Sequence, residues 1–142
     1  MYVIFTSGST GIPKCVKITH SNVASALHHQ VELLGLKKTS RVLDFASYSY
    51  TVAIGNVCGA LAAGGCLCVP NDRDRKEKLA EVIRSFQANV IDFTPSVAQL
   101  LTPEEIPSVE SFITGGEALR LRSVLLQVSK FPSGLLANFI ST

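Results

Sequence analysis

Short apolar runs of strand type alternate with segments of helical periodicity along this chain, and this alternation limits the fold more than any other feature. The pattern predicts buried strands at 42–45, 66–69, 90–93 and 111–114. Helices are predicted between them at 52–63, 74–86 and 94–101. Strands joined through helices lie parallel in one sheet, and the helices cover both of its faces. We therefore predict an α/β fold with a mostly parallel sheet covered by helices.

The two ends of the chain add further elements. Short strands at 2–5 and 16–18 flank a glycine-rich loop. The segment 21–34 has apolar residues at helical spacing, and Gly35 stands where such a helix would end. Towards the other end, an apolar stripe over 121–128 predicts a helix, and 135–139 a last strand. The chain begins in a strand and ends in or just after one, so we expect a fragment of a larger domain.

Composition excludes several classes of protein. The chain has 142 residues, 46% of them hydrophobic, which is too apolar for a disordered protein. Its net charge of +2 and lack of a dense basic run give no reason to expect nucleic acid as a partner. The apolar stretch 52–69 contains Asn56 and the Gly64-Gly65 pair, which favour a buried helix and strand over a membrane span. We expect its four cysteines to be free buried thiols in a cytoplasmic protein.

The loop between the first two strands has the composition of a phosphate-binding segment. Its sequence, residues 6–14, is TSGSTGIPK. Glycines permit tight turns, so that backbone N–H groups and hydroxyls converge on phosphate oxygens, and Lys14 adds a positive charge. It is not a Walker A loop, because Pro13 precedes the lysine and a strand rather than a helix follows. An ordinary Ser/Gly hairpin is the alternative for a loop of this composition.

The run YVIFTSGSTGIPK at 2–14 resembles the phosphate-loop signature of the adenylate-forming enzymes, namely acyl-CoA synthetases, luciferases and adenylation domains of nonribosomal peptide synthetases. Further segments at the family's spacing are 18–23, 45–53, 64–70, 94–96 and 114–119. The resemblance covers nearly the whole chain and is greatest to adenylation domains of fungal-type peptide synthetases. It implies part of the large N-terminal subdomain of that fold, with residues 1–142 as a central fragment that lacks the C-terminal lid.

The resemblance also implies an activity. A carboxylic or amino acid would react with ATP and Mg²⁺ to give an acyl-adenylate and pyrophosphate. The acyl group would then pass to a carrier-protein phosphopantetheine thiol, or to CoA. The glutamate that the family associates with Mg²⁺ lies beyond this chain, so no metal ligand is expected within it. Neither a membrane nor nucleic acid is an expected partner, and the isolated fragment is expected to be inactive.

Carried onto this sequence, the family's motifs give two sets of candidate residues. Lys14 is the candidate catalytic residue. The candidate ATP-binding residues are Thr6, Ser7, Gly8, Ser9, Thr10, Gly11, Lys14, Gly116, Glu117 and Ala118. The candidate substrate-binding residues are Tyr50, Thr51, Val52, Gly55, Ser96, Ile113 and Gly115.

The sequence departs from the family pattern at several positions. Cys15 replaces the glycine after the loop lysine, and Ile140 and Ser141 replace a tyrosine and a glycine. Thr51 stands where domains that activate α-amino acids have an aspartate, and a hydroxyl does not neutralise an ammonium group. Either the substrate lacks an α-ammonium group or the site has decayed, unless a carboxylate from outside the fragment takes over the pairing.

Two alternative functions remain open from the sequence. An acyl- or aryl-CoA ligase uses the same chemistry, and Thr51 mildly favours it. A non-catalytic remnant of an adenylation domain is a different class of protein, and the departures at Cys15, Thr51, Ile140 and Ser141 favour that interpretation.

Overall fold

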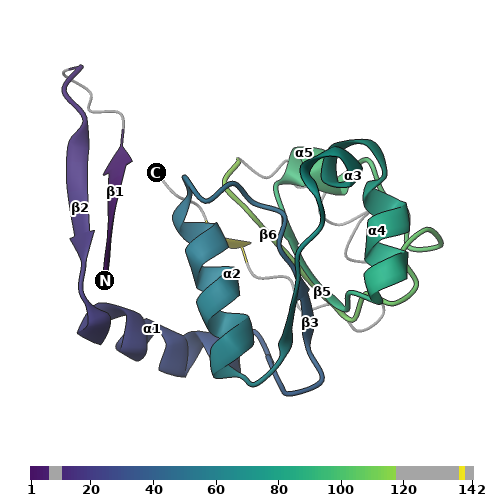
Figure 1. The fold of residues 1–142 in the computed structure, drawn as a ribbon, viewed down its shortest axis with the longest axis horizontal. Coiled ribbons are helices and arrows are strands. Elements are labelled where there is room, and N and C mark those ends of the chain that lie inside the picture. Colours follow the sequence, from purple (N-terminus) through teal and green to yellow (C-terminus); the bar gives the residue numbers. More distant parts are fainter. Residues whose placement is uncertain (7–10, 118–137, 140–142) are drawn as a thin grey trace.

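The computed structural model describes residues 1–6, 11–117 and 138–139, and its main feature is a parallel sheet (Figure 1). The strand order is β4-β3-β5-β6-β7, and each neighbouring pair is parallel. The strands are β3 (Arg41–Leu43), β4 (Cys66–Cys68), β5 (Val90–Phe93), β6 (Ser111–Gly115) and β7 (Asn138–Phe139). The predicted α/β class and parallel sheet are confirmed.

The order in which the chain adds strands to the sheet reverses at β3. Helix α2 (Thr51–Ala62) leads from β3 to β4, and α3 (Asp72–Glu77) and α4 (Leu79–Phe86) lead back to β5, on the other side of β3. Right-handed crossovers in opposite directions place their helices on opposite faces of the sheet. Ligands of open α/β sheets bind outside the carboxyl ends of the strands at such a reversal. This topology points to the carboxyl ends of β3 and β5.

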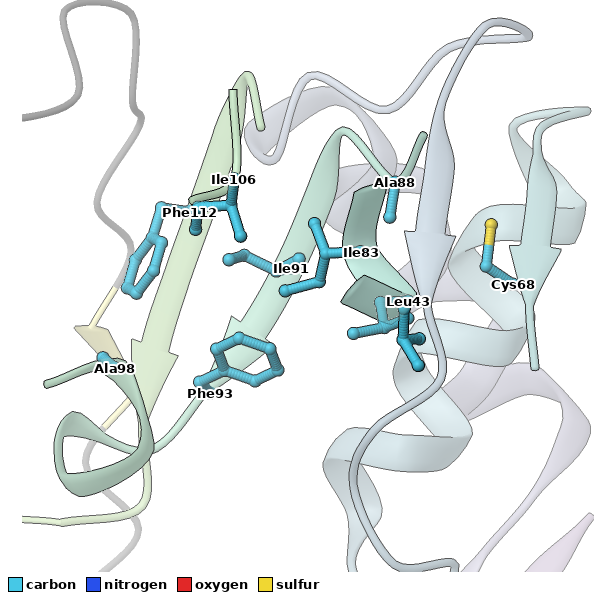
Figure 2. Close-up of a cluster of buried hydrophobic side chains, with 10 residues drawn as sticks. Leu43, Cys68, Ile83, Ala88, Ile91, Phe93, Ala98, Ile106 and Phe112 are labelled. Carbon is cyan, nitrogen blue, oxygen red and sulfur yellow. The ribbon is translucent and has the colours of Figure 1, made fainter. Parts of the chain in front are cut away.

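Each face of the sheet has its own apolar core, as expected for buried parallel strands. On the α4 face, Ile83 packs with side chains from four strands and from α5 (Pro95–Ala98) (Figure 2). The buried members of this cluster are Leu43, Cys68, Val82, Ile83, Ala88, Ile91, Phe93, Ala98, Ile106 and Phe112. On the α2 face the buried cluster is Leu34, Val42, Ala60, Val90 and Ile113. Alternate residues of β5 thus enter different cores.

The first two strands form a separate antiparallel hairpin that stands apart from the five-stranded sheet (Figure 1). Strands β1 (Tyr2–Thr6) and β2 (Lys14–Ile18) pair so that Thr6 lies opposite Lys14. Helix α1 (His20–Leu33) follows, and a capping box between Thr19 and Asn22 fixes its start. It packs against α2 and ends before Gly35, whose φ of +62° suits glycine. The predicted strands and helix here are confirmed.

The prediction of one helix over 74–86 is wrong, because the chain breaks at Lys78 (φ −138°, ψ 39°). The apolar stripe that predicted the helix belongs to α4 alone, and it packs on the sheet. Helix α3 has no apolar face; Arg75 holds it by donating to the Phe45 carbonyl at 3.2 Å. The break allows each helix to meet its own partner.

Helix α5 is also shorter than the predicted 94–101. Thr94 is its N-cap and Pro95 its first residue, as predicted. After Ala98 the backbone hydrogen bonds change from the i−4 to the i−3 type. Leu100 N–H, for example, donates to Val97 O at 3.0 Å. Leu100 is 75% exposed, so no apolar contact extends the helix there. The predicted helix over 121–128 and the first residues of the predicted strand 135–139 lie outside the described residues.

All four cysteines are free, as predicted, but the expectation that all are buried is wrong. Cys15 and Cys66 are exposed, Cys58 is half-buried and Cys68 is buried. Within the described part of the chain, no helix is long and apolar enough to cross a membrane.

Candidate functional site

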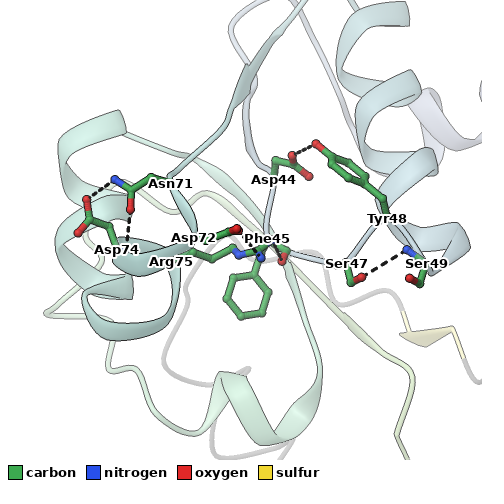
Figure 3. A network of polar contacts seen from close by, with 9 residues as sticks. All are labelled: Asp44, Phe45, Ser47, Tyr48, Ser49, Asn71, Asp72, Asp74 and Arg75. Carbon is green, nitrogen blue, oxygen red and sulfur yellow. Dashed lines mark hydrogen bonds and ion pairs between the residues drawn. The ribbon is translucent and has the colours of Figure 1, made fainter.

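The loop after β3 is held in place by polar contacts, and it leads into the start of α2 (Figure 3). Tyr48 donates its hydroxyl hydrogen to Asp44. This hydrogen bond, together with burial and the negative charge of Asp44, raises the pKa of Tyr48. Asp44 is only 5% exposed, and the bond to Tyr48 offsets part of the cost of burying its carboxylate. The anchored loop sets the position of Tyr50 and Thr51, at the carboxyl end of β3.

A cavity of about 420 Å³ lies along the first half of α2. Thr51, Val52 and Gly55, three of the predicted substrate-binding residues, line it together. Its other walls come from α1 and the base of the hairpin, including Tyr2 and Ile18. The structure therefore gathers the α2 part of the predicted acyl site around one hollow.

Asp92 also lines this cavity, and the sequence analysis did not select it. It lies on β5, facing α2, where Asn56 Nδ2 donates to its Oδ2 at 3.2 Å. Burial raises the pKa of Asp92 to about 6, against a smaller opposing effect of the Asn56 hydrogen bond. A signal was present in the sequence: an aspartate in an otherwise apolar buried strand is uncommon, because a buried carboxylate needs a partner.

None of the other predicted substrate-binding residues is among those that line the cavity. Ile113 is 2% exposed and lies beside Asp92 in the neighbouring strand β6. Gly115 follows two residues later, at the carboxyl end of the same strand. Tyr50 is 66% exposed, and neither it nor Ser96 is among the residues that line the cavity. Their roles stay predictions.

Ser96 instead contacts a predicted ATP-binding residue. Its hydroxyl donates to Oε2 of Glu117 at 2.6 Å, and its backbone N–H donates to the same oxygen at 3.2 Å. The Ser96 hydroxyl lowers the pKa of Glu117, because its hydrogen bond favours the ionised carboxylate. Gly116, with φ +81°, makes the turn that brings the glutamate to the start of α5.

The predicted phosphate loop joins the two strands of the hairpin. Thr6, Gly11 and Lys14 are described and exposed, and Gly11 has a φ of +82°. Ser7, Gly8, Ser9, Thr10 and Ala118 lie outside the described residues, as do Ile140 and Ser141. Cys15 lies in β2 opposite Phe5, in an extended segment that does not require glycine. The carboxyl end of β1 and the carboxyl ends of the sheet strands point toward the same end of the molecule (Figure 1).

The exposed Lys14 suits an anionic ligand. Among the described residues it makes no ion pair, so its charge is available. No atom of the described residues lies within 4 Å of where a Cβ of Gly11 would stand, which suits close approach of a phosphate to the backbone. In the described ranges no three His, Cys, Asp or Glu side chains gather to hold a metal ion.

Comparisons with known proteins agree with this arrangement. The AMP-binding enzyme family matches residues 1–132, and the chain belongs to that family. Peramine synthetase ppzA of Metarhizium rileyi is 56% identical over 124 residues, which are 87% of this chain and 4% of that protein. Nonribosomal peptide synthetase dtxS1 of Metarhizium robertsii is 49% identical over 87% of this chain and 2% of its own length. The chain therefore spans only a small part of these relatives.

Solved structures show the same fold. The Vibrio cholerae adenylation domain AlmE, in complex with glycyl-adenosine-5'-phosphate, superposes with a TM-score of 0.84 at 26% identity, over 99% of this chain and 28% of that one. VinN, in complex with L-aspartate, gives a TM-score of 0.82 at 26% identity, over 99% of this chain and 36% of that one. The predicted relation to the adenylation-domain fold is confirmed.

Proposed function

We propose that this chain is part of an adenylation domain of a nonribosomal peptide synthetase, which activates a carboxylic or amino acid with ATP. The observation that carries the proposal is the pairing of two features in one fold. A hairpin joins its strands through the loop TSGSTGIPK, and a cavity lined by Thr51, Val52 and Gly55 lies along α2, the helix that follows β3 at the strand-order reversal. The synthetases and adenylation domains to which the chain is similar support it.

The reaction has two steps. The carboxylate of the acid attacks the α-phosphorus of ATP, and the bond to the β-phosphate breaks, giving an acyl-adenylate and pyrophosphate. A phosphopantetheine thiol of a carrier protein then attacks the acyl carbon, and AMP leaves. A CoA thiol in the second step would make the protein an acyl- or aryl-CoA ligase, the alternative that Thr51 mildly favours.

The proposed role of the loop is electrostatic. Negative charge builds on the departing pyrophosphate, and Lys14 with the hydroxyls and N–H groups of residues 6–11 would stabilise it. Gly116 and Glu117 would border the nucleotide at the carboxyl end of β6. Mg²⁺ would neutralise further phosphate charge, with its protein ligand beyond these residues. We also propose that residues 1–142 form the central part of the domain, that the lid lies outside them, and that the domain acts in the cytoplasm.

The test replaces the loop lysine in the complete domain that contains this chain. Lys14→Ala should slow acid-dependent exchange of pyrophosphate into ATP by roughly 100-fold, the usual effect of losing one charged donor at a developing anion. Lys17→Ala is the matched control, because Lys17 is an exposed lysine on the other face of the same strand. Equal exchange rates for Lys14→Ala and wild type would remove Lys14 from its role. Absence of exchange in wild type with any acid would contradict the proposed function.

A further inference from the structure

Two of the free cysteines lie together on β4, the edge strand of the described sheet. Cys66 and Cys68 are two residues apart on this strand, so their side chains project from the same face. Cys68 belongs to the buried cluster on the α4 face, and Cys66 therefore projects from that face as well. The cavity along α2 lies on the other face of the sheet. The cysteine pair is thus separate from the candidate functional site.

The two sulfur atoms lean toward each other. The Cys66 thiol donates to the Leu67 carbonyl oxygen at 3.8 Å, which turns it along the strand toward Cys68. The Cys68 sulfur points back toward the beginning of β4, where Cys66 lies (Figure 2). Burial raises the pKa of the Cys68 thiol, and Cys66 raises it further through its charge and a hydrogen bond. The two thiols therefore interact directly.

Arg41 places a positive charge beside the pair. It is the β3 residue opposite Cys66, and its Nε donates to the Phe86 carbonyl oxygen at 2.6 Å. Phe86 ends α4, so the Arg41 side chain lies on the same face of the sheet as the two thiols. None of the ion pairs in the described part of the chain includes Arg41. Its charge is therefore available to a negative group formed at the two sulfurs.

The spacing of the pair suits a bridging ion better than a disulfide. Residues two apart on a strand have Cα atoms about 6.6 Å apart, and the Cβ atoms on one face are nearly as far from each other. A disulfide needs Cβ atoms about 3.8 Å apart. The backbone of β4 is held at both ends, because Cys66 N–H donates to Ser40 O at 2.8 Å and Cys68 O accepts from Asp44 N–H at 2.9 Å. An ion between the sulfurs, with metal–sulfur bonds of about 2.3 Å, spans up to about 4.6 Å without moving the strand.

The chemistry of the pair indicates which kind of ion fits. Within the described residues the pair offers two sulfur ligands, whereas structural zinc sites take four ligands in a tetrahedron. Two thiolates satisfy Cu(I), a soft ion that favours sulfur and accepts linear coordination. Two thiolates and one monovalent cation leave a single negative charge, which the Arg41 guanidinium offsets.

We propose that Cys66 and Cys68 form a binding site for a soft monovalent metal ion, Cu(I), held between their sulfur atoms at the edge of the sheet. Each thiol releases its proton to solvent as its sulfur–metal bond forms, and the ion keeps its oxidation state. The exposed Cys66 gives the ion access, and the buried Cys68 supplies the second sulfur from the side of the core. This site goes beyond the proposed adenylation function and does not depend on it.

The main experiment follows the reactivity of Cys66 in the complete domain that contains this chain. Cu(I) is the probe, supplied without oxygen and buffered by the chelator bicinchoninate. Iodoacetamide then modifies the accessible thiols, and peptide mass spectrometry measures the modification of each cysteine. Cu(I) should slow the modification of Cys66 by about 100-fold, because two linked ligands bind far more tightly than one. Cys15 is the internal control, since it is also exposed and has no cysteine two residues away.

Two variants test whether both sulfurs are needed. In Cys68→Ala, which keeps a small apolar side chain in the core, Cu(I) should no longer protect Cys66. A cooperative urea transition of this variant shows that it is folded. Cys66→Ser changes only an exposed position, and it should bind one Cu(I) fewer than wild type in competition with bicinchoninate. Cys15→Ser is the matched control and should bind as many ions as wild type.

Three results would overturn the assignment. Equal protection of Cys66 in wild type and Cys68→Ala would mean that a single thiol binds the ion. Equal protection by Zn²⁺ and Cu(I) would mean that the site does not select a soft monovalent ion. A Cys66 that fails to react even without Cu(I) would leave the ion no access. None of these readouts requires pyrophosphate exchange, so failure of the proposed function would leave this inference standing, and the reverse.

Discussion

Ser96 donates its hydroxyl hydrogen to Glu117 at 2.6 Å, and this contact joins the start of α5 to the turn after β6. The backbone N–H of Ser96 reaches the same carboxylate oxygen at 3.2 Å. A predicted substrate-binding residue is thus bonded to a predicted ATP-binding residue.

Replacing Ser96 should release Glu117. In Ser96→Ala the pKa of Glu117 should rise toward its ordinary value, because the largest of the interactions that favour its ionised form is lost. NMR titration of the glutamate carboxyl group measures this shift. Ser85→Ala is the control, since the Ser85 hydroxyl donates to the Val82 carbonyl of its own helix and does not contact Glu117. An unchanged Glu117 titration in Ser96→Ala would show that the hydroxyl contact does not form in solution.

The buried carboxylate of Asp92 should make stability depend on pH. Its pKa of about 6 in the fold, against 3.8 in the unfolded chain, means that the native state holds the proton more tightly between these values. Stability should therefore fall as pH rises from about 4 to about 7. Asp92→Asn removes this loss and should stabilise the chain at pH 8 by up to about 3 kcal/mol, with little effect at pH 3.

Urea unfolding at pH 3 and pH 8 measures the difference for Asp92→Asn. Glu110→Gln, which removes an exposed carboxylate, should show no comparable gain at pH 8. A destabilised Asp92→Asn at pH 8 would mean that the native state compensates the charge of Asp92 by interactions other than the Asn56 amide.

The apolar patterns of the chain were sufficient to predict the sheet. Residues 90–93 are a short, mostly apolar run typical of a buried strand, and β5 forms at those positions. The same reasoning failed at Lys78, because an unbroken run of helix-forming residues does not reveal that Arg75 and Phe86 have different partners. Arg75 bonds the Phe45 carbonyl 30 residues away, and the Phe86 carbonyl accepts from Arg41, 45 residues away. Periodicity reports local structure and not such distant contacts.

In the candidate site, too, the sequence predicted residues of one segment but not the contact between distant segments. Thr51, Val52 and Gly55 are close in sequence within one motif, and they line one cavity as the motif predicts. Asp92 approaches them only because β5 lies beside β3 and the Asn56 amide turns toward it, across 36 residues. A motif comparison finds residues that share a segment. The three-dimensional fold was required to find the carboxylate that faces them from another strand.

The core on the α4 face should carry much of the stability of the sheet. Ile83 is fully buried between α4 and the strands, so Ile83→Ala should lower the free energy of unfolding by about 2–5 kcal/mol. Leu100→Ala also shortens an aliphatic side chain, but at a position that is 75% exposed. It should change the free energy of unfolding by less than about 0.5 kcal/mol. Urea denaturation of the two variants compares them directly. Similar losses would mean that α4 does not pack as described.

The turn between α2 and β4 should not tolerate a side chain at Gly65. A Cβ there would stand 2.7 Å from the Ser40 carbonyl oxygen and 3.2 Å from that of Lys37, and neither backbone atom moves without disturbing the start of β3. Gly65 N–H also donates to Ala60 O at 2.9 Å, which ties the turn to the end of α2. Gly65→Ala should therefore cost about 3 kcal/mol, through displacement of packed backbone.

Gly35→Ala is the matched comparison, because it isolates the effect of backbone conformation. Gly35 has a φ of +62° but open space around the position of a Cβ, so its replacement should cost only about 1 kcal/mol, the penalty of a left-handed alanine. Urea unfolding gives both values. The pairing of β3 with β4 begins at Arg41 and Cys66, next to the clash, so amide exchange in these strands should accelerate in Gly65→Ala and not in Gly35→Ala. A Gly65→Ala protein as stable as Gly35→Ala would show that the two backbones do not approach each other so closely.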